Sequence, residues 1–147
     1  MNDNSQLGLW LGGILPAVAL GIFGVLIKAS GAAGLGASGL LLAMAGATAL
    51  TGLALWWLPD CRAITPTGLI YAGIAGLIWA VCQALILFAV TRWQTPISKL
   101  VPLFNMNTLV AVLLGLVWFA EYQSVSLPKL LLGATLIVVG GMLVANA

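Results

Sequence analysis

Charged residues are scarce in this sequence, and histidine is missing from it altogether. Lys, Arg, Asp and Glu together make up 5% of the 147 residues, whereas 63% are hydrophobic. A soluble domain carries about 25% charged residues, and no soluble fold of this size could bury so much apolar surface. We therefore expect an integral membrane protein. The net charge of +2 is too small, and its charges too dispersed, to indicate nucleic-acid binding.

The sequence also lacks a ligand set for a metal ion. It has no His and no CxxC or HExxH motif, and its two cysteines are Cys61 in a loop and Cys82 in an apolar run. One cysteine should lie near the membrane interface and the other near mid-membrane, so we expect no disulfide. The apolar runs contain no cysteine pair or carboxylate pair for acid–base or metal chemistry. We therefore expect neither an enzyme nor a bound cofactor.

Five apolar runs are present, and they predict the fold. Each is about 20 residues long, the length of a spanning helix; they cover 7–27, 37–58, 68–90, 100–120 and 127–145. They do not alternate polar with apolar residues, which excludes membrane β-strands. A signal peptide begins with a basic region, but the first ten residues here contain no Lys or Arg. We therefore interpret the first run as a retained span. We predict one all-α integral membrane domain over residues 1–147, a bundle of five transmembrane helices.

Prolines and small residues predict local features of these helices. Pro16 and Pro102 lie inside runs, where they should kink the helix and free the carbonyls of Gly12 and Ser98. A hydroxyl cap with a proline in the first turn predicts three helix starts: Thr65 with Pro66, Thr95 with Pro96, and Ser126 with Pro128. Small residues on one face predict close helix packing; these are Gly39, Ala43, Ala47 and Thr51 in one run, and Gly133 and Gly140 in another.

Polar side chains follow Pro102 inside the fourth run. Asn105, Asn107 and Thr108 lie in hydrocarbon there, where an amide is costly unless it is partnered or faces water. A kinked span with amides just past the kink is typical of a substrate pathway. The alternative is that the amides hold helices together. Helical geometry puts Pro102, Asn105 and Thr108 on one face, which we assign to the pathway, and Asn107 nearly opposite, where we expect a structural role.

A second polar position lies in the third run. Gln83 is near its middle and must find a hydrogen-bond partner, and Trp79 offers a flat apolar wall one turn away. We add both to the pathway; bonding to a neighbouring helix is the alternative for Gln83. No charged residue lies at this depth, so the pattern favours a neutral or zwitterionic solute. Lys28 and Glu121 lie at span ends, where we expect interfacial structural roles; lining a cavity mouth is the alternative for Lys28.

From the third run onward, the sequence resembles the EamA-type domain of the drug/metabolite transporter superfamily. The resemblance rests on Pro102–Leu103 early in the fourth run, on Glu121 at its end, and on GATLIVVGG over 133–141. The five-helix layout matches one half of such a ten-helix transporter across the whole chain. The sequence departs from the family pattern at Leu20–Gly21, where Trp-Gly is frequent, and at Ala120, where glycine usually precedes the glutamate.

The resemblance implies a small-molecule secondary transporter that works by alternating access between two inverted halves. A half-size chain would need a second copy, so we expect a homodimer, in an antiparallel arrangement. With five spans, the side of the N-terminus holds Arg62 and Lys129. The opposite side holds Lys28, Arg92 and Lys99. This weak bias favours a cytoplasmic C-terminus and permits both orientations. The expected partners are a small-molecule solute, the lipid bilayer (a bacterial inner membrane) and a second copy. The alternative function is a non-transporting membrane scaffold or accessory subunit.

Overall fold

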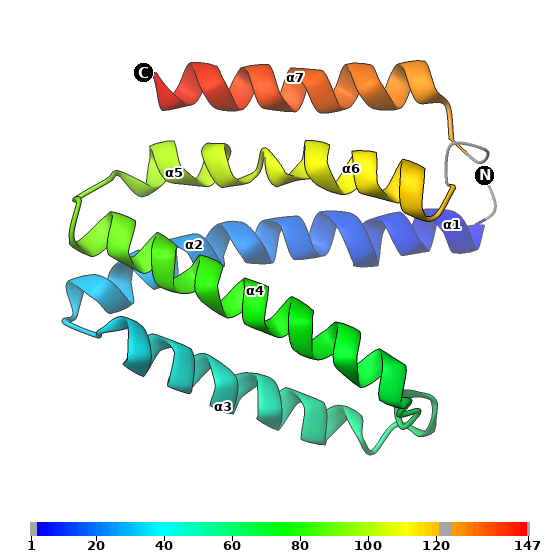
Figure 1. Cartoon of the computed structure of the whole chain (residues 1–147), viewed down its shortest axis with the longest axis horizontal. Coiled ribbons are helices and arrows are strands. Elements are labelled where there is room, and N and C mark those ends of the chain that lie inside the picture. The colour runs from blue at the N-terminus through cyan, green and yellow to red at the C-terminus, as the bar shows by residue number, and fades with distance from the viewer. Residues whose placement is uncertain (1–2, 121–124, 147) are drawn as a thin grey trace. The chain divides into compact units, whose positions relative to one another are not determined.

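The computed structural model describes residues 3–120 and 125–146, and no strand occurs in that part of the chain. Its elements are α1 (Asp3–Leu9), η1 (Trp10–Ile14), α2 (Leu15–Ala32), α3 (Ala37–Leu55), η2 (Pro59–Cys61), α4 (Pro66–Thr91), α5 (Ile97–Phe104), α6 (Asn107–Trp118) and α7 (Leu127–Ala145). Five helical stretches are long and apolar enough to cross a membrane: Gln6–Ala32, Ala37–Leu55, Pro66–Thr91, Ile97–Trp118 and Leu127–Ala145 (Figure 1). The predicted all-α fold with five membrane-compatible helices is therefore confirmed.

The chain forms two compact units. Unit 1 comprises Met1–Gly24 and Thr95–Ala147, and unit 2 comprises Val25–Gln94. The boundary on the N-terminal side falls inside α2, between Gly24 and Val25. The polar positions predicted for one pathway are thus divided between the two units: those near Pro102 belong to unit 1, and Trp79 and Gln83 belong to unit 2.

In unit 1, Pro16 disturbs the first helix as predicted, and the disturbance takes the form of a π turn. Trp10–Ile14 form one π-helical turn that ends two residues before the proline, and the N–H of Leu15 donates to the carbonyl of Trp10, five residues back. A π turn widens the helix by one residue, which gives the proline ring room. The helix then continues as α2 without a gap.

The three predicted helix starts differ in outcome. Thr65 is the N-cap of α4, and its hydroxyl accepts a hydrogen bond of 3.2 Å from the Gly68 N–H. The prediction for α5 is wrong by one residue, because Pro96 itself is the N-cap. Its extended backbone turns its carbonyl toward the helix, where it accepts from the N–H groups of Lys99 and Leu100. Ser126 is the N-cap of α7, but its side chain makes no capping hydrogen bond.

Helix α7 packs along α5 and α6 in unit 1 (Figure 1). Its buried residues are Ala134 and Gly141, seven residues apart on one face. A Cβ on Gly141 would lie 2.9 Å from the carbonyl oxygen of Pro102, so only glycine permits this approach. Among the described residues, nothing lies within 4 Å of a Cβ at Gly133 or Gly140, so the predicted packing face is not the one that packs there. The packing face is displaced by one residue.

Unit 2 brings the end of α2, the start of α3 and the end of α4 together. Its buried apolar side chains come from all three segments; they are Ile27, Leu40, Leu87 and Val90. Gly31 allows α2 to approach α4, because a Cβ there would lie 2.6 Å from Thr91 Cγ2 and 2.9 Å from Leu87 Cδ1. The predicted small-residue face of α3 is not the packed one, because Ala43, Ala47 and Thr51 are exposed and Leu40 is buried instead.

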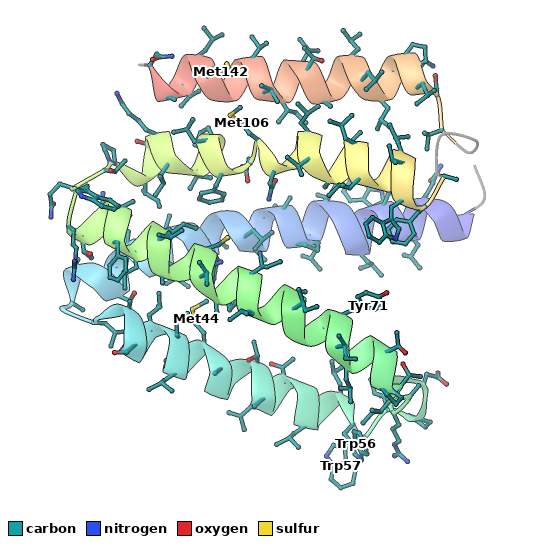
Figure 2. All side chains as sticks on the ribbon, viewed as in Figure 1. Met44, Trp56, Trp57, Tyr71, Met106 and Met142 are labelled. Carbon is teal, nitrogen blue, oxygen red and sulfur yellow. The ribbon has the colours of Figure 1, made fainter. Side chains whose placement is uncertain are left out.

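The C-terminal end of α3 is capped by an arginine side chain and followed by two tryptophans. The guanidinium of Arg62 donates to the carbonyl of Trp56 at 2.8 Å and to that of Trp57 at 3.4 Å. These carbonyls have no partner inside the helix, so the arginine side chain acts as a C-terminal cap. Both tryptophans lie at this end of α3 (Figure 2), as expected for residues at a membrane interface.

Candidate functional site

The helix break after Pro102 is the most irregular point inside a membrane-compatible stretch of unit 1. α5 ends at Phe104 and α6 begins at Asn107, so Asn105 and Met106 belong to neither helix. The N–H of Met106 donates to the carbonyl of Leu103, three residues back, instead of to that of Pro102. The disturbance predicted at Pro102 is therefore present, and it takes the form of a helix break after the proline. The low helix propensity of asparagine favours a break at this place.

Thr108, in the first turn of α6, forms hydrogen bonds across this break. Its N–H donates to the carbonyl of Asn105 at 3.1 Å, and its hydroxyl donates to the same oxygen at 2.8 Å. One carbonyl freed by the break thus receives two hydrogen bonds. Among the predicted pathway residues, the structure brings Pro102, Asn105 and Thr108 together at the break. Thr108 has its hydroxyl engaged there with the backbone.

The asparagine side chains lie on either side of the same break. Asn105 and Asn107 are both exposed, and within the described residues neither side-chain amide makes a hydrogen bond. Each amide carries two donors and one acceptor oxygen. On the other side of the break, Met106 points toward α7, and a Cβ on Gly141 would lie 3.7 Å from Met106 Cγ (Figure 2). The break is thus held by Met106 and Pro102, while its amides remain available.

Gln83 is the buried polar side chain of unit 2. Only 6% of its surface is exposed, and its Oε1 accepts no hydrogen bond from the described residues. It shares a stripe of α4 with Leu87 and Val90, which are also buried. Gln83 lies roughly 12 Å along the axis from the end of α4, well inside the length that a hydrocarbon core covers. A buried acceptor without a donor costs about 1–3 kcal/mol.

Trp79 lies one turn before Gln83 on α4, and 39% of its surface is exposed. The two side chains therefore combine an apolar surface with an amide on one helix, as the sequence predicted. Such a combination suits a small solute that has an apolar part and an uncharged polar group.

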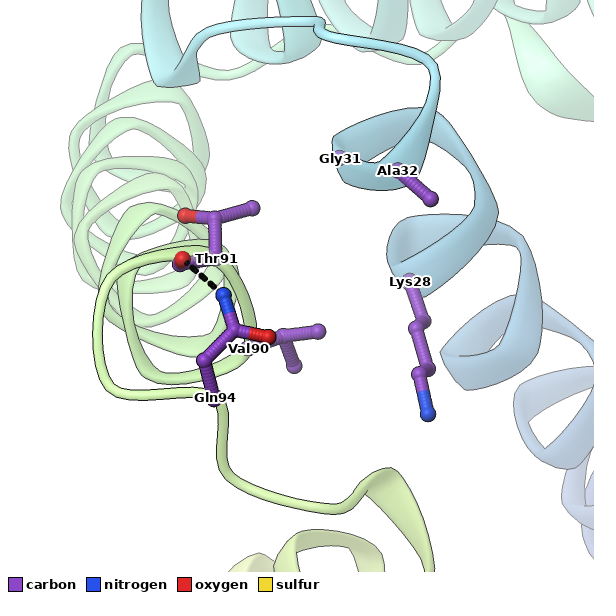
Figure 3. A pocket seen from close by; sticks show the side chains of 6 residues that line it. All are labelled: Lys28, Gly31, Ala32, Val90, Thr91 and Gln94. Carbon is purple, nitrogen blue, oxygen red and sulfur yellow. Dashed lines mark hydrogen bonds between the residues drawn. The ribbon is translucent and has the colours of Figure 1, made fainter.

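A shallow hollow of about 170 Å³ lies elsewhere in unit 2, and Lys28 is the one lining residue that was singled out from the sequence. Its lining residues come from the end of α2 and the end of α4; they are Lys28, Gly31, Ala32, Val90, Thr91 and Gln94. Figure 3 shows Lys28 on one side of the hollow and Thr91 and Gln94 on the other. The Nε2 of Gln94 donates to the carbonyl of Thr91 at 2.7 Å. Lys28 thus lines a cavity, and lining a cavity mouth was the alternative role expected for this residue.

Other predicted positions add little chemistry. Glu121 lies outside the described residues. Cys61 and Cys82 are free thiols. Within the part of the chain that the structure describes, no three His, Cys, Asp or Glu side chains gather where they could hold a metal ion.

The comparisons with known proteins give no match. No family model matches the sequence, no curated protein sequence matches it, and no solved structure matches its fold. The resemblance to the EamA-type domain therefore stays a prediction from the residues named above.

Proposed function

We propose that this chain inserts into the cell membrane as five spanning helices, and that this membrane is a bacterial inner membrane. We further propose that it is one half of a secondary transporter for a small, neutral or zwitterionic polar solute. Two copies would form the transporter and alternate access between the two sides of the membrane. The five membrane-compatible helices support the insertion. The EamA-type resemblance supports the half-size assembly.

The observation that carries the transport proposal is the orphaned amide oxygen of Gln83. It is buried, it lies at hydrocarbon depth, and it lacks a donor within the described residues. Folding tolerates such a group mainly where function needs it or where a further partner satisfies it. A hydroxyl or N–H of a solute supplies that partner.

The helix break in unit 1 supports the same proposal independently. Irregular backbone at membrane depth is tolerated where it lines a cavity or is buried in protein. The break at Asn105–Met106 presents an exposed amide without a hydrogen bond in the described residues. We assign Asn105 in unit 1, and separately Gln83 with Trp79 in unit 2, to the solute pathway. Pro102 and Thr108 are assigned to the shape of the break.

The test uses the purified full-length protein in detergent and a panel of metabolites, read as shifts in melting temperature. A solute that binds only the folded protein, present at a free concentration of 100 times its Kd, raises the free energy of unfolding by about 2.7 kcal/mol. Gln83→Leu removes the amide and keeps a similar side-chain volume. We expect this variant to lose the solute-induced shift while its melting temperature without solute stays equal to that of the wild type or rises.

The rival reading gives the opposite pattern. If Gln83 only bonds another helix in an assembled scaffold, Gln83→Leu should lower the stability without solute and leave the binding by the folded fraction unchanged. Asn105→Ala is tested in the same way. Asn146→Ala is a control outside the break, because Asn146 is an exposed amide at the end of α7 whose Nδ2 donates to the Met142 carbonyl at 2.9 Å. The proposed site is wrong if Gln83→Leu and Asn105→Ala both follow the scaffold pattern.

A further inference from the structure

The hollow between the ends of α2 and α4 combines groups of different chemistry. Lys28 places three N–H donors and a positive charge on one side. On the other side, the Nε2 of Gln94 is engaged with the Thr91 carbonyl, so the Oε1 of this amide is the group left to accept a hydrogen bond. The Thr91 hydroxyl is also engaged, because it donates to the Leu87 carbonyl at 2.8 Å. The hollow therefore offers one cation and one neutral acceptor.

The backbone holds the acceptor in place. Gln94 has a positive φ of 52°, a conformation that a residue with a side chain rarely adopts. The hydrogen bond from its own side chain to Thr91 fixes the amide at the end of α4. On the opposite wall, Gly31 allows α2 to come close to Leu87 and Thr91. Gln94 itself lies in the loop after α4, and its side-chain hydrogen bond to Thr91 places its amide on the side of the hollow opposite Lys28.

The surroundings of the hollow are positively charged. If the helices of unit 2 cross the membrane in turn, Lys28 and Arg92 lie on one side and Asp60, the acidic residue of this unit, lies on the other. Asp60 follows α3, about 28 Å along that helix from the loop beside the hollow. Within the described residues of unit 2, no carboxylate is therefore placed to neutralise Lys28.

Arg92 and Trp93 identify this end of unit 2 as interfacial. The guanidinium of Arg92 lies 4.8 Å from the centre of the Phe88 ring, and Trp93 is 69% exposed. Exposed tryptophan and cations at the end of an apolar helix are typical of the headgroup level of a bilayer. The hollow thus opens at the depth where lipid phosphates lie.

We propose that this hollow binds the headgroup of an anionic phospholipid that carries a hydroxyl, such as phosphatidylglycerol. The lipid phosphate accepts from the Lys28 ammonium, and the headgroup hydroxyl donates to the Oε1 of Gln94. A free phosphate ion fits less well, because a single lysine faces it and it has no acyl chains to hold it beside the apolar helices. A choline headgroup has no donor for Gln94. This proposal is independent of transport, since it shares no residue with the proposed solute pathway.

The experiment titrates the purified full-length protein, in a neutral detergent, with phosphatidylglycerol, phosphatidylcholine or inorganic phosphate. Bound lipid is counted by native mass spectrometry, and the melting temperature is followed in parallel. For the wild type we expect phosphatidylglycerol to be retained at least several-fold more than phosphatidylcholine and to raise the melting temperature. Equal retention of the two lipids overturns the proposal, as does a stabilisation by inorganic phosphate equal to that by phosphatidylglycerol.

Two variants locate the site. We expect Lys28→Gln to lose most of the preference for phosphatidylglycerol, and Lys28→Arg to restore it, because arginine keeps the charge and the donors. The matched control is Lys129→Gln, which removes a cation in the first turn of α7 on the opposite membrane side and should keep the preference. If Lys129→Gln loses as much as Lys28→Gln, the lipid responds to net charge alone and the hollow is not its site. If Lys28→Gln does not fold, the test uses Lys28→Arg, which should keep the preference for phosphatidylglycerol, and Gln94→Ala, which should weaken it. The proposed hydroxyl contact is overturned if Gln94→Ala shows the same preference as the wild type.

Discussion

At the residue scale, Ala120 stands in a conformation that suits glycine better. Its φ is 53°, directly after the end of α6 at Trp118 and the C-cap Phe119. The left-handed conformation costs a residue with a Cβ roughly 1–2 kcal/mol, because the Cβ approaches the following carbonyl. The EamA-type pattern has glycine at the position that Ala120 occupies here. The backbone therefore gives a physical reason for the residue type expected from the resemblance.

We predict that Ala120→Gly raises the free energy of unfolding by up to about 1 kcal/mol. Glycine relieves the left-handed strain, and its greater freedom in the unfolded chain cancels part of the gain. Thermal unfolding in detergent, followed by tryptophan fluorescence, measures the change. Ala111→Gly is the control, because Ala111 is an exposed residue inside α6, where glycine should cost about 1 kcal/mol. Equal destabilisation by both variants would contradict the prediction.

The N-cap of α4 is the second residue-scale feature with a measurable effect. Thr65→Ala removes the acceptor for the Gly68 N–H and should cost about 1 kcal/mol of stability. Thr65→Ser keeps the hydroxyl and should stay within a few tenths of the wild type. Both are measured by the same thermal unfolding. The cap has no role here if the two variants have the same melting temperature.

At the scale of elements, the contact between α7 and the end of α5 depends on one glycine. Gly141 faces the Pro102 carbonyl, whose usual helical donor, the Met106 N–H, bonds Leu103 instead. A methyl group at Gly141 meets backbone and not a flexible side chain, so the helices must move apart. Gly140, its neighbour, has no atom of the described residues within 4 Å of a Cβ placed on it. The two glycines of one motif therefore have different roles.

We predict that Gly141→Ala lowers the free energy of unfolding by about 1–3 kcal/mol, the cost of overpacking. Gly140→Ala, the matched control, should leave it unchanged or raise it slightly, because alanine is the better helix former. Chemical or thermal unfolding of the two variants side by side gives the comparison. A larger loss for Gly140→Ala would place the close contact on the other face of α7, in an assembly of copies.

At the scale of the whole molecule, the distribution of cations bears on orientation. Arg62 and Lys129 are opposed by Lys28, Arg92 and Lys99, and acidic residues contribute little to the choice of orientation. A division of two against three is too even to impose one topology. The proposed antiparallel homodimer needs this balance, because its two copies must insert in opposite directions.

We therefore predict that both orientations are present in the cell membrane. The test first replaces the exposed thiols Cys61 and Cys82, and then introduces a single cysteine by Asn4→Cys or Asn146→Cys. A membrane-impermeant thiol reagent, added to intact cells, should label part of the population of each variant. Permeabilised cells provide the control for total labelling. Labelling of only one terminus would exclude the antiparallel dimer and leave a parallel dimer or a different partner chain.

The sequence by itself determined the fold class and the number of membrane-compatible helices. Both follow from the length and composition of local segments: 20 apolar residues need a helix when no water is present to satisfy the backbone. The cap at Thr65 and the disturbances near Pro16 and Pro102 were predictable for the same reason, because each depends on backbone groups within one turn.

Only the tertiary structure decided which helix faces pack and which polar groups are left without partners. Gly133, Gly140, Ala134 and Gly141 are all small, and composition does not distinguish them; the approach of the Pro102 carbonyl selects Gly141. The hollow beside Lys28 likewise depends on Gln94, more than 60 residues away in the sequence, and on how closely α2 meets α4. Contacts between distant segments depend on the shapes of two surfaces together, and neither segment carries that information alone.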